Sequence, residues 1–275
     1  MQNIALPQKI EFKKGEEQNR GLIIVEPCYP GYGTTLGNSL RRVLLSSLAG
    51  AAVVGVKIKG ASHEFSAIPH VKEDILEIIL NLKRLRLKVY ADEAIKLELD
   101  VHGEKEVRAS DIAKNSQVEI VNPDLVLAHI TDMAGSLNME IFVSCGRGYE
   151  TIESRGEKKH ETGYIEMDSI FTPILSVGVN IDNVRVGKMT NWDKLTLDIL
   201  TDGTITPKEA FGQAAEILIN QFRALSGEKE ETSIGKKEEA ATAPETIETT
   251  GGKGEIGEAE VKEEVKKKRG RPKKS

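Results

Sequence analysis

The stretch Thr34-Thr-Leu-Gly-Asn-Ser-Leu-Arg-Arg-Val-Leu-Leu-Ser-Ser-Leu48 combines a helical apolar pattern with two adjacent arginines. Its spacing predicts a helix that opens near Gly31 and ends near Leu48. The broad apolar face of this helix is formed by Leu36, Leu40, Val43, Leu44 and Leu48. Asn38 and Arg42 share the opposite side, where an arginine is usually only solvated. Beside an asparagine it can instead make forked hydrogen bonds to a partner's carboxylate or carbonyl groups.

Strand and helix patterns alternate on both sides of this helix. Residues 9–13 alternate apolar and charged side chains, and residues 22–25 and 51–59 form apolar runs typical of strands. One face of a second helix is formed by Val71, Ile75, Ile78, Ile79 and Leu82. Further strand-like runs cover residues 85–89, 95–101, 118–121, 139–143, 174–179 and 195–200. The polar stretch 146–163 is predicted to be a loop or hairpin.

The last helix has the clearest start signal. Thr206-Pro207-Lys208-Glu209 reads as a capping box with proline at the first helical position. A seam of 3.5-residue period follows, formed by Phe211, Ala215, Leu218, Phe222 and Leu225. Such a seam suits the core of a single chain, and it also suits helix pairing between two chains. Two heptads do not distinguish these alternatives.

Composition and charge exclude several classes of protein. The chain has 275 residues, of which 43 are acidic and 38 basic, so its formal charge of −5 does not indicate a protein that coats nucleic acid. Two cysteines exclude a disulfide scaffold. The first twenty residues mix both charges, unlike a signal peptide, and the longest apolar stretch, residues 49–56, is far shorter than the ~20 residues of a membrane span. We therefore expect a cytoplasmic protein.

No catalytic residue, cofactor or metal site is predicted. The loop Gly31-Tyr-Gly-Thr-Thr-Leu-Gly37 loosely matches a dinucleotide-binding loop, but its spacing differs and no acid ends the next strand. A nucleotide-binding enzyme that uses this loop stays open as an alternative. The five histidines are too far apart in sequence to form a helical metal pair.

Residues 227–275 differ in composition from the rest of the chain. They contain no aromatic residue, leucine or methionine, so they are predicted to be a disordered charged tail. The last ten residues hold seven bases and no acid, and Arg269, Gly270, Arg271 and Pro272 resemble the core of an AT-hook. Arginine inserted into a narrow A·T minor groove is the expected mode of binding to A·T-rich DNA. The alternatives are a nonspecific basic tail and an architectural DNA-binding protein that acts mainly through this tail.

The segment from Gly31 to Ser47 closely resembles the signature helix of the bacterial DNA-directed RNA polymerase alpha subunit family. Other stretches match the family in the same order, namely residues 63–66, 71–83, 111–112, 118–121, 146–149 and 201–207. The resemblance covers about residues 5–226, the amino-terminal assembly half. Several long motifs in the correct order make a chance match very improbable.

The resemblance implies an α+β fold in two parts. A dimerisation domain of sheet plus long helices is expected from residues 1–50 and 173–226. A mostly β insert domain, residues 51–172, is expected to interrupt it. The usual carboxy-terminal DNA-binding domain of the family is expected to be absent, because no apolar periodic segment follows Leu225.

The resemblance also implies a homodimer that scaffolds polymerase assembly, one protomer contacting the beta subunit and the other beta-prime. The chain would be a non-catalytic subunit of a nucleotidyltransferase. The contacts to the large subunits are expected at Asn38, Arg41, Arg42, His63, Glu64, Phe65, Ser66, Glu73 and Asp74. The dimer interface is expected at Leu36, Leu40, Leu44, Phe211, Ala215, Leu218, Phe222 and Leu225.

Overall fold

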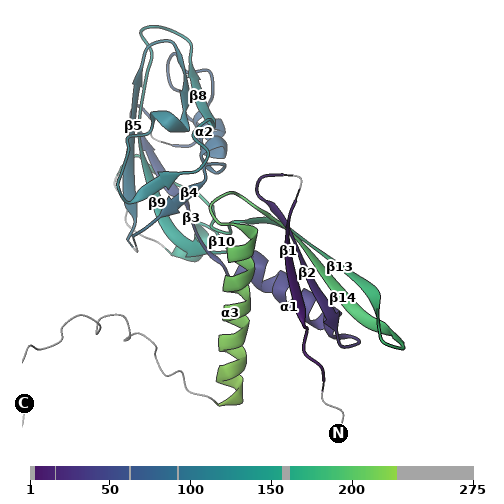
Figure 1. The fold of residues 1–275 in the computed structure, drawn as a ribbon. Coiled ribbons are helices and arrows are strands. Elements are labelled where there is room, and N and C mark those ends of the chain that lie inside the picture. Colours follow the sequence, from purple (N-terminus) through teal and green to yellow (C-terminus); the bar gives the residue numbers. More distant parts are fainter. Residues whose placement is uncertain (1–3, 16, 62, 92, 157–161, 228–275) are drawn as a thin grey trace, which may run out of the picture. The chain divides into compact units, whose positions relative to one another are not determined.

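The computed structural model describes residues 4–15, 17–61, 63–91, 93–156 and 162–227 (Figure 1). Two sheets, each with its own apolar core, account for most of this part of the chain. Apart from Gly227, the charged tail lies outside the described residues, as do the AT-hook-like positions 269–272. The predictions for the tail therefore stay predictions.

The first sheet is antiparallel, with the strand order β1-β2-β14-β13. Its strands are β1 (Lys9–Lys14), β2 (Arg20–Cys28), β13 (Ile174–Val186) and β14 (Met189–Thr201). β13 and β14 form a long hairpin, and β14 pairs with β2 so that Leu197 lies opposite Ile23. The two ends of the folded part of the chain are therefore joined in one sheet.

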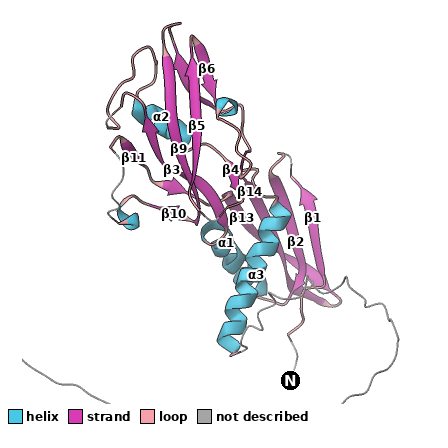
Figure 2. Cartoon of the chain, turned by 90° about the vertical axis from the view of Figure 1, so that its left-hand side faces the viewer, coloured by secondary structure: helices cyan, strands magenta, loops and turns pink. Residues whose placement is uncertain are grey.

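Helices α1 (Tyr32–Ser46) and α3 (Pro207–Ser226) pack against this sheet and against each other (Figure 2). Leu44 of α1 and Ala210 of α3 are fully buried in the shared core. Gly37 lets α1 approach the sheet closely, because a Cβ there would lie 2.8 Å from a methyl carbon of Val179 and 2.9 Å from one of Leu195. The glycine inside this helix is therefore required by packing, although glycine normally weakens a helix.

The second sheet has six strands in the order β5-β9-β3-β4-β7, with β11 paired to β3. Its strands are β3 (Ala49–Ile58), β4 (Leu87–Val89), β5 (Ile95–His102), β7 (Val118–Ile120), β9 (Ser136–Arg147) and β11 (Tyr164–Glu166). Two-stranded sheets are formed by β6 (Lys105–Arg108) with β8 (Val126–Ile130), and by β10 (Tyr149–Glu150) with β12 (Ser169–Ile170). Helix α2 (Ile75–Leu82) and the short 3-10 helices η1 (Ala109–Asp111) and η2 (Glu153–Arg155) complete this part.

Phe171 is buried where the chain returns from the second sheet to the first. Gly50 and Gly146 are paired across β3 and β9. A Cβ on Gly50 would overlap the carbonyl oxygen of Phe171, and a Cβ on Gly146 would lie 2.7 Å from the Phe171 ring. The amide of Phe171 also donates a hydrogen bond to the carbonyl of Gly148 at 2.8 Å. Both paired positions therefore need glycine.

The mixed α+β architecture with an inserted sheet confirms the expected fold class. The exact boundaries at 50/51 and 172/173 stay a prediction, with β3 beginning at Ala49 and β13 at Ile174. The second helix is shorter than its apolar pattern indicated, because Val71 forms a bridge with Ile130 instead of a helical turn. Among the described helices, none is long and apolar enough to cross a membrane.

Candidate assembly interface

The start of α1 is held by a carboxylate from β14. The amides of Gly31 and Gly33 donate hydrogen bonds to Oδ2 of Asp193 at 2.9 and 3.0 Å. A Cβ on Gly33 would lie 2.8 Å from the Cβ of Asp193, so this contact depends on glycine. The backbone donors that a nucleotide phosphate would need at this helix end are thus already bound by the protein's own acid. This contact disfavours the alternative of a nucleotide site in this loop.

The outer side of α1 carries a row of exposed polar side chains. Asn38, Arg41 and Arg42 are all exposed, and the exposed apolar side chain of Leu45 lies one turn beyond Arg41. Within the described ranges, neither guanidinium has an ion-pair partner. Both arginines are consequently available to a carboxylate or carbonyl outside this chain.

The inner side of α1 corrects part of the expected dimer interface. Leu40 and Leu44 are buried in the core beneath α1, packed against the sheet of their own chain. Leu36 and Val43 are half-buried at the edge of this core. Sequence alone did not separate these positions, because all four leucine and valine side chains fall on one broad face. Only Leu36 of the three expected α1 positions keeps surface that a second chain can contact.

A second exposed area combines the loop after β3 with the outer side of α2. Phe65 is 76% exposed, and Leu76 and Leu80, one turn apart on α2, are also exposed. The loop is fixed to the helix, because the amide of Ile75 donates to the carbonyl of Ser66 at 3.3 Å. Ser66 Oγ lies 3.2 Å from Nδ1 of His63, which closes the loop on itself. The four expected positions 63–66 therefore lie beside the start of α2.

The sequence analysis did not single out Leu76 and Leu80. The apolar spacing of this helix identifies the four residues that face the core, and it does not mark these two leucines. The signal was present, however, because leucines at these two positions widen the apolar face of α2, so that its only polar residues are Glu77 and Asn81. So wide an apolar face is more than the core of a single chain needs.

The burial of Glu73 contradicts its expected role as a contact residue. Only 6% of it is exposed, and its carboxylate accepts a hydrogen bond from the backbone amide of His129 at 2.7 Å. The other carboxylate oxygen lies 2.5 Å from Nδ1 of the same histidine. Glu73 therefore fixes the start of α2 to β8, while the neighbouring Asp74 is exposed at the N-cap of α2.

The environment of Glu73 lowers its pKa. Burial by itself would raise the pKa of this carboxyl, but the hydrogen bonds from the amide and ring of His129 outweigh it and hold the pKa below the ordinary value of 4.5. A lowered pKa in the folded state means that the carboxylate stabilises the fold above pH 4.5. This contribution is lost as the pH falls through the lower value of the folded protein.

We expect Glu73→Gln to destabilise the protein by about 1–3 kcal/mol at pH 7, because a charged acceptor of two hydrogen bonds is removed from a buried position. The difference from the native protein should narrow as the pH falls from 4.5, where the carboxyl of the unfolded chain becomes protonated, through the lower pKa of the folded protein. Urea unfolding at a series of pH values measures it. Glu77→Gln, an exposed change on the same helix, should alter stability by less than about 0.5 kcal/mol.

The seam on α3 divides into a covered half and an open half. The predicted capping box is confirmed, since Glu209 N donates to Thr206 Oγ1 at 3.3 Å and Thr206 N to Glu209 Oε2 at 2.9 Å. Phe211 packs edge-on against Phe12 of β1, with 5.9 Å between ring centroids. Ala215 and Leu218 are half-buried beside the core.

Beyond this point the seam is open to solvent. Phe222 is 61% exposed and Leu225 is 82% exposed, and Ile219 is exposed beside them. Figure 1 shows this carboxy-terminal half of α3 clear of the sheet. Within the described part of the chain, the last two turns of the seam have no apolar neighbour that could cover them.

Comparison with known proteins places the chain in a family. The model of the RNA polymerase Rpb3/RpoA insert domain matches residues 56–172. The DNA-directed RNA polymerase subunit alpha of Macrococcus caseolyticus is 47% identical over 237 residues, which is 85% of this chain and 75% of that protein. The same subunit of Desulforamulus reducens is 48% identical over 84% of this chain and 75% of its own length. The same subunit of Carboxydothermus hydrogenoformans is 47% identical over 80% of this chain and 72% of its own length. With this similarity spread over both sheets, the chain belongs to the family of DNA-directed RNA polymerase alpha subunits.

Proposed function

We propose that the protein is a non-catalytic scaffold, which forms a homodimer and then holds the beta and beta-prime subunits of RNA polymerase. The observation that supports this most directly is the open half of the α3 seam, where Phe222 and Leu225 face solvent. Apolar side chains in regular heptad spacing bury well against the same stripe of a second copy. A two-fold axis makes such a surface self-complementary, and this is the commonest symmetry of homodimers.

The α1 surface supports the second half of the proposal. In the dimer, the half-buried Leu36 of α1 would face the second copy. Asn38, Arg41 and Arg42 would stay exposed on the outer side of the helix. The exposed Phe65, together with the leucines of α2, offers an apolar patch on the inserted part. Arginine and aromatic side chains are enriched among the residues that dominate interface energies. We assign the large-subunit contacts to these two surfaces.

Replacing Arg42 with alanine tests the large-subunit contact. We expect the variant to dimerise normally but to capture the large subunits about 10–100-fold more weakly, since a charge-assisted hydrogen-bond pair contributes about 1.5–3 kcal/mol. Arg42→Lys should recover only part of the loss, because lysine keeps the charge without the planar fork. Titration of purified beta subunit against the full-length dimer, followed by native mass measurement, gives both quantities.

Arg185→Ala is the matched control, because this exposed arginine lies at the tip of the β13–β14 hairpin and bonds only to the carbonyl of Gly187 among the described residues. It should leave capture unchanged. Normal capture by Arg42→Ala would refute the assignment of the α1 surface. A failure of the native dimer to form would refute the scaffold itself.

The basic end of the tail supports a second candidate function. Its seven bases without an acid, around Arg269-Gly-Arg-Pro272, suit insertion into the narrow minor groove of A·T-rich DNA. Contacts to seven phosphates would give a slope of log affinity against log salt of about −0.9 for each contact. This activity would tether upstream DNA to the polymerase.

A truncation after Gly227 should lose this affinity for A·T-rich duplex and its steep salt dependence. Replacing both Arg269 and Arg271 with lysine keeps the charge, and it should remove the preference for A·T-rich over G·C-rich duplex while leaving the salt slope in place. Fluorescence anisotropy with the full-length chain measures both. Equal affinity of the truncated and full-length proteins for A·T-rich DNA would rule out a role of the tail.

A further inference from the structure

The inserted sheet contains a pocket that the assembly surfaces do not use. Its volume is about 430 Å³, which lies within the range of about 300–1,000 Å³ for small-molecule sites. It lies between β5 and β7, the two outer strands of the sheet, and the segment 109–117 forms one wall. The side chains of Leu97 and Ile112 form an apolar floor, continuous with the core of the sheet.

The walls of this pocket are fixed by backbone hydrogen bonds. The amide of Ala113 donates to the carbonyl of Glu98 on β5 at 2.8 Å. On the other side of the pocket, the amide of Val118 donates to the carbonyl of Asn115 at 3.3 Å. The wall segment is thus tied to both outer strands. A site with a preformed wall loses little conformational entropy when it is filled.

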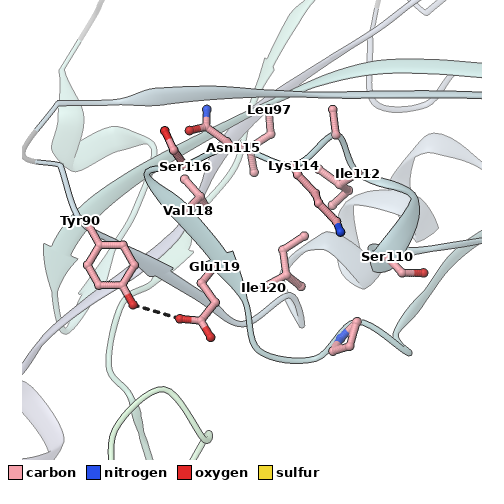
Figure 3. Close-up of a pocket in the computed structure, with 12 residues that line it drawn as sticks. Tyr90, Leu97, Ser110, Ile112, Lys114, Asn115, Ser116, Val118, Glu119 and Ile120 are labelled. Carbon is pink, nitrogen blue, oxygen red and sulfur yellow. Dashed lines mark hydrogen bonds between the residues drawn. The ribbon is translucent and has the colours of Figure 1, made fainter.

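Ionisable side chains stand at two places around the apolar floor (Figure 3). Tyr90 lies at one side, where its hydroxyl donates to Oε2 of Glu119 at 2.9 Å, so its ring is held in place with most of its surface exposed. Lys114 lies at the other side, next to Ile112. Among the residues that the structure describes, the ammonium group of Lys114 has no acidic partner. The pocket therefore combines an apolar floor, an aromatic side wall that carries Glu119, and a lysine at the other side that forms no ion pair within the described residues.

From this arrangement we propose that the pocket binds a small molecule with a planar apolar body and one anionic group. The body would lie on the floor and against the ring of Tyr90, since aromatic pairs favour offset or edge-on contact. The anionic group would pair with Lys114 at the mouth. The carboxylate of Glu119 lies beside Tyr90, at the side of the pocket opposite Lys114. It would repel a second anionic group of the ligand at that side. The site is independent of the scaffold proposal, because none of its residues belongs to the α1, α2 or α3 surfaces.

Two fluorescent probes of similar shape test the proposal. 8-Anilinonaphthalene-1-sulfonate carries the planar body and an anion, and N-phenyl-1-naphthylamine carries the same body without the charge. We expect Lys114→Gln in the full-length protein to weaken binding of the sulfonate about fivefold, as for loss of one partly exposed ion pair, and to leave the neutral probe unchanged. Lys59→Gln, which removes a lysine from a different hollow of the inserted sheet, is the matched control and should change neither.

Ala113→Trp provides a second, independent variant. Ala113 is exposed and lines the pocket, so the added ring should fill it without disturbing the core. Both probes should lose at least tenfold in affinity, and the amide resonances of residues 113–120 should no longer shift when either probe is added. If both probes bind Ala113→Trp and Lys114→Gln as well as the native protein, they bind elsewhere and the proposal is overturned. Equal weakening of both probes by Lys114→Gln would overturn the anionic part of it.

Discussion

The double variant Phe222→Asp, Leu225→Asp is expected to sediment as a monomer at concentrations where the native protein is a dimer. Both side chains are exposed on the open half of α3, so the substitutions remove nothing from the core of the single chain. In a dimer they would place four carboxylates in an apolar seam. Central apolar positions of an interface contribute about 2 kcal/mol or more each, so the dissociation constant should rise about a thousandfold or more. Sedimentation velocity over a range of concentrations measures this.

A matched variant separates the effect of the seam from the effect of charge. Asn220→Asp with Ala224→Asp adds the same two negative charges to the same turns of α3, on the side away from the seam. This protein should stay a dimer, and circular dichroism should show equal helix content in both variants. A dimeric Phe222→Asp, Leu225→Asp protein would mean that the chains pair through another surface.

The second large effect is expected from Gly50→Ala at the return of the chain to the first sheet. The added methyl group would overlap the backbone carbonyl of Phe171, and the backbone of this residue is fixed because its amide donates a hydrogen bond to the carbonyl of Gly148. Overpacking that moves backbone costs about 3 kcal/mol. For a folded part of this size the melting temperature should fall by about 6–12 °C, measured at one fixed protein concentration.

Gly212→Ala is the control for this change, and it should act in the opposite direction. Gly212 lies inside α3, and a Cβ there would meet no atom within 4 Å. Alanine is favoured over glycine in a helix by about 1 kcal/mol, so the melting temperature should rise slightly. A similar loss of stability in both variants would show that glycine itself, rather than the contact with Phe171, is needed.

Local patterns predicted most of the helices and the longer strands. The start of α3 was readable because Thr206 and Glu209 bond to each other within one turn. The short strands β10 and β12 were not readable, since two residues take a strand conformation only when a partner strand lies beside them. The family resemblance supplied the division of the folded part into two domains, because no change in composition marks the boundary between them. It also supplied the contact residues, of which Glu73 was wrong because no local pattern shows that His129 lies against it.

The amino-acid sequence by itself determined the three helices, the polar row on α1 and the seam on α3, because each depends on side chains only a turn apart. The tertiary structure alone decided which of these apolar residues remain available. Leu44 and Phe222 look equivalent as members of apolar stripes, yet one is buried under the sheet and the other faces solvent. Burial depends on segments that are distant in the sequence and adjacent in the fold, such as β14 and Phe171 here. Periodicity carries no information about such distant neighbours.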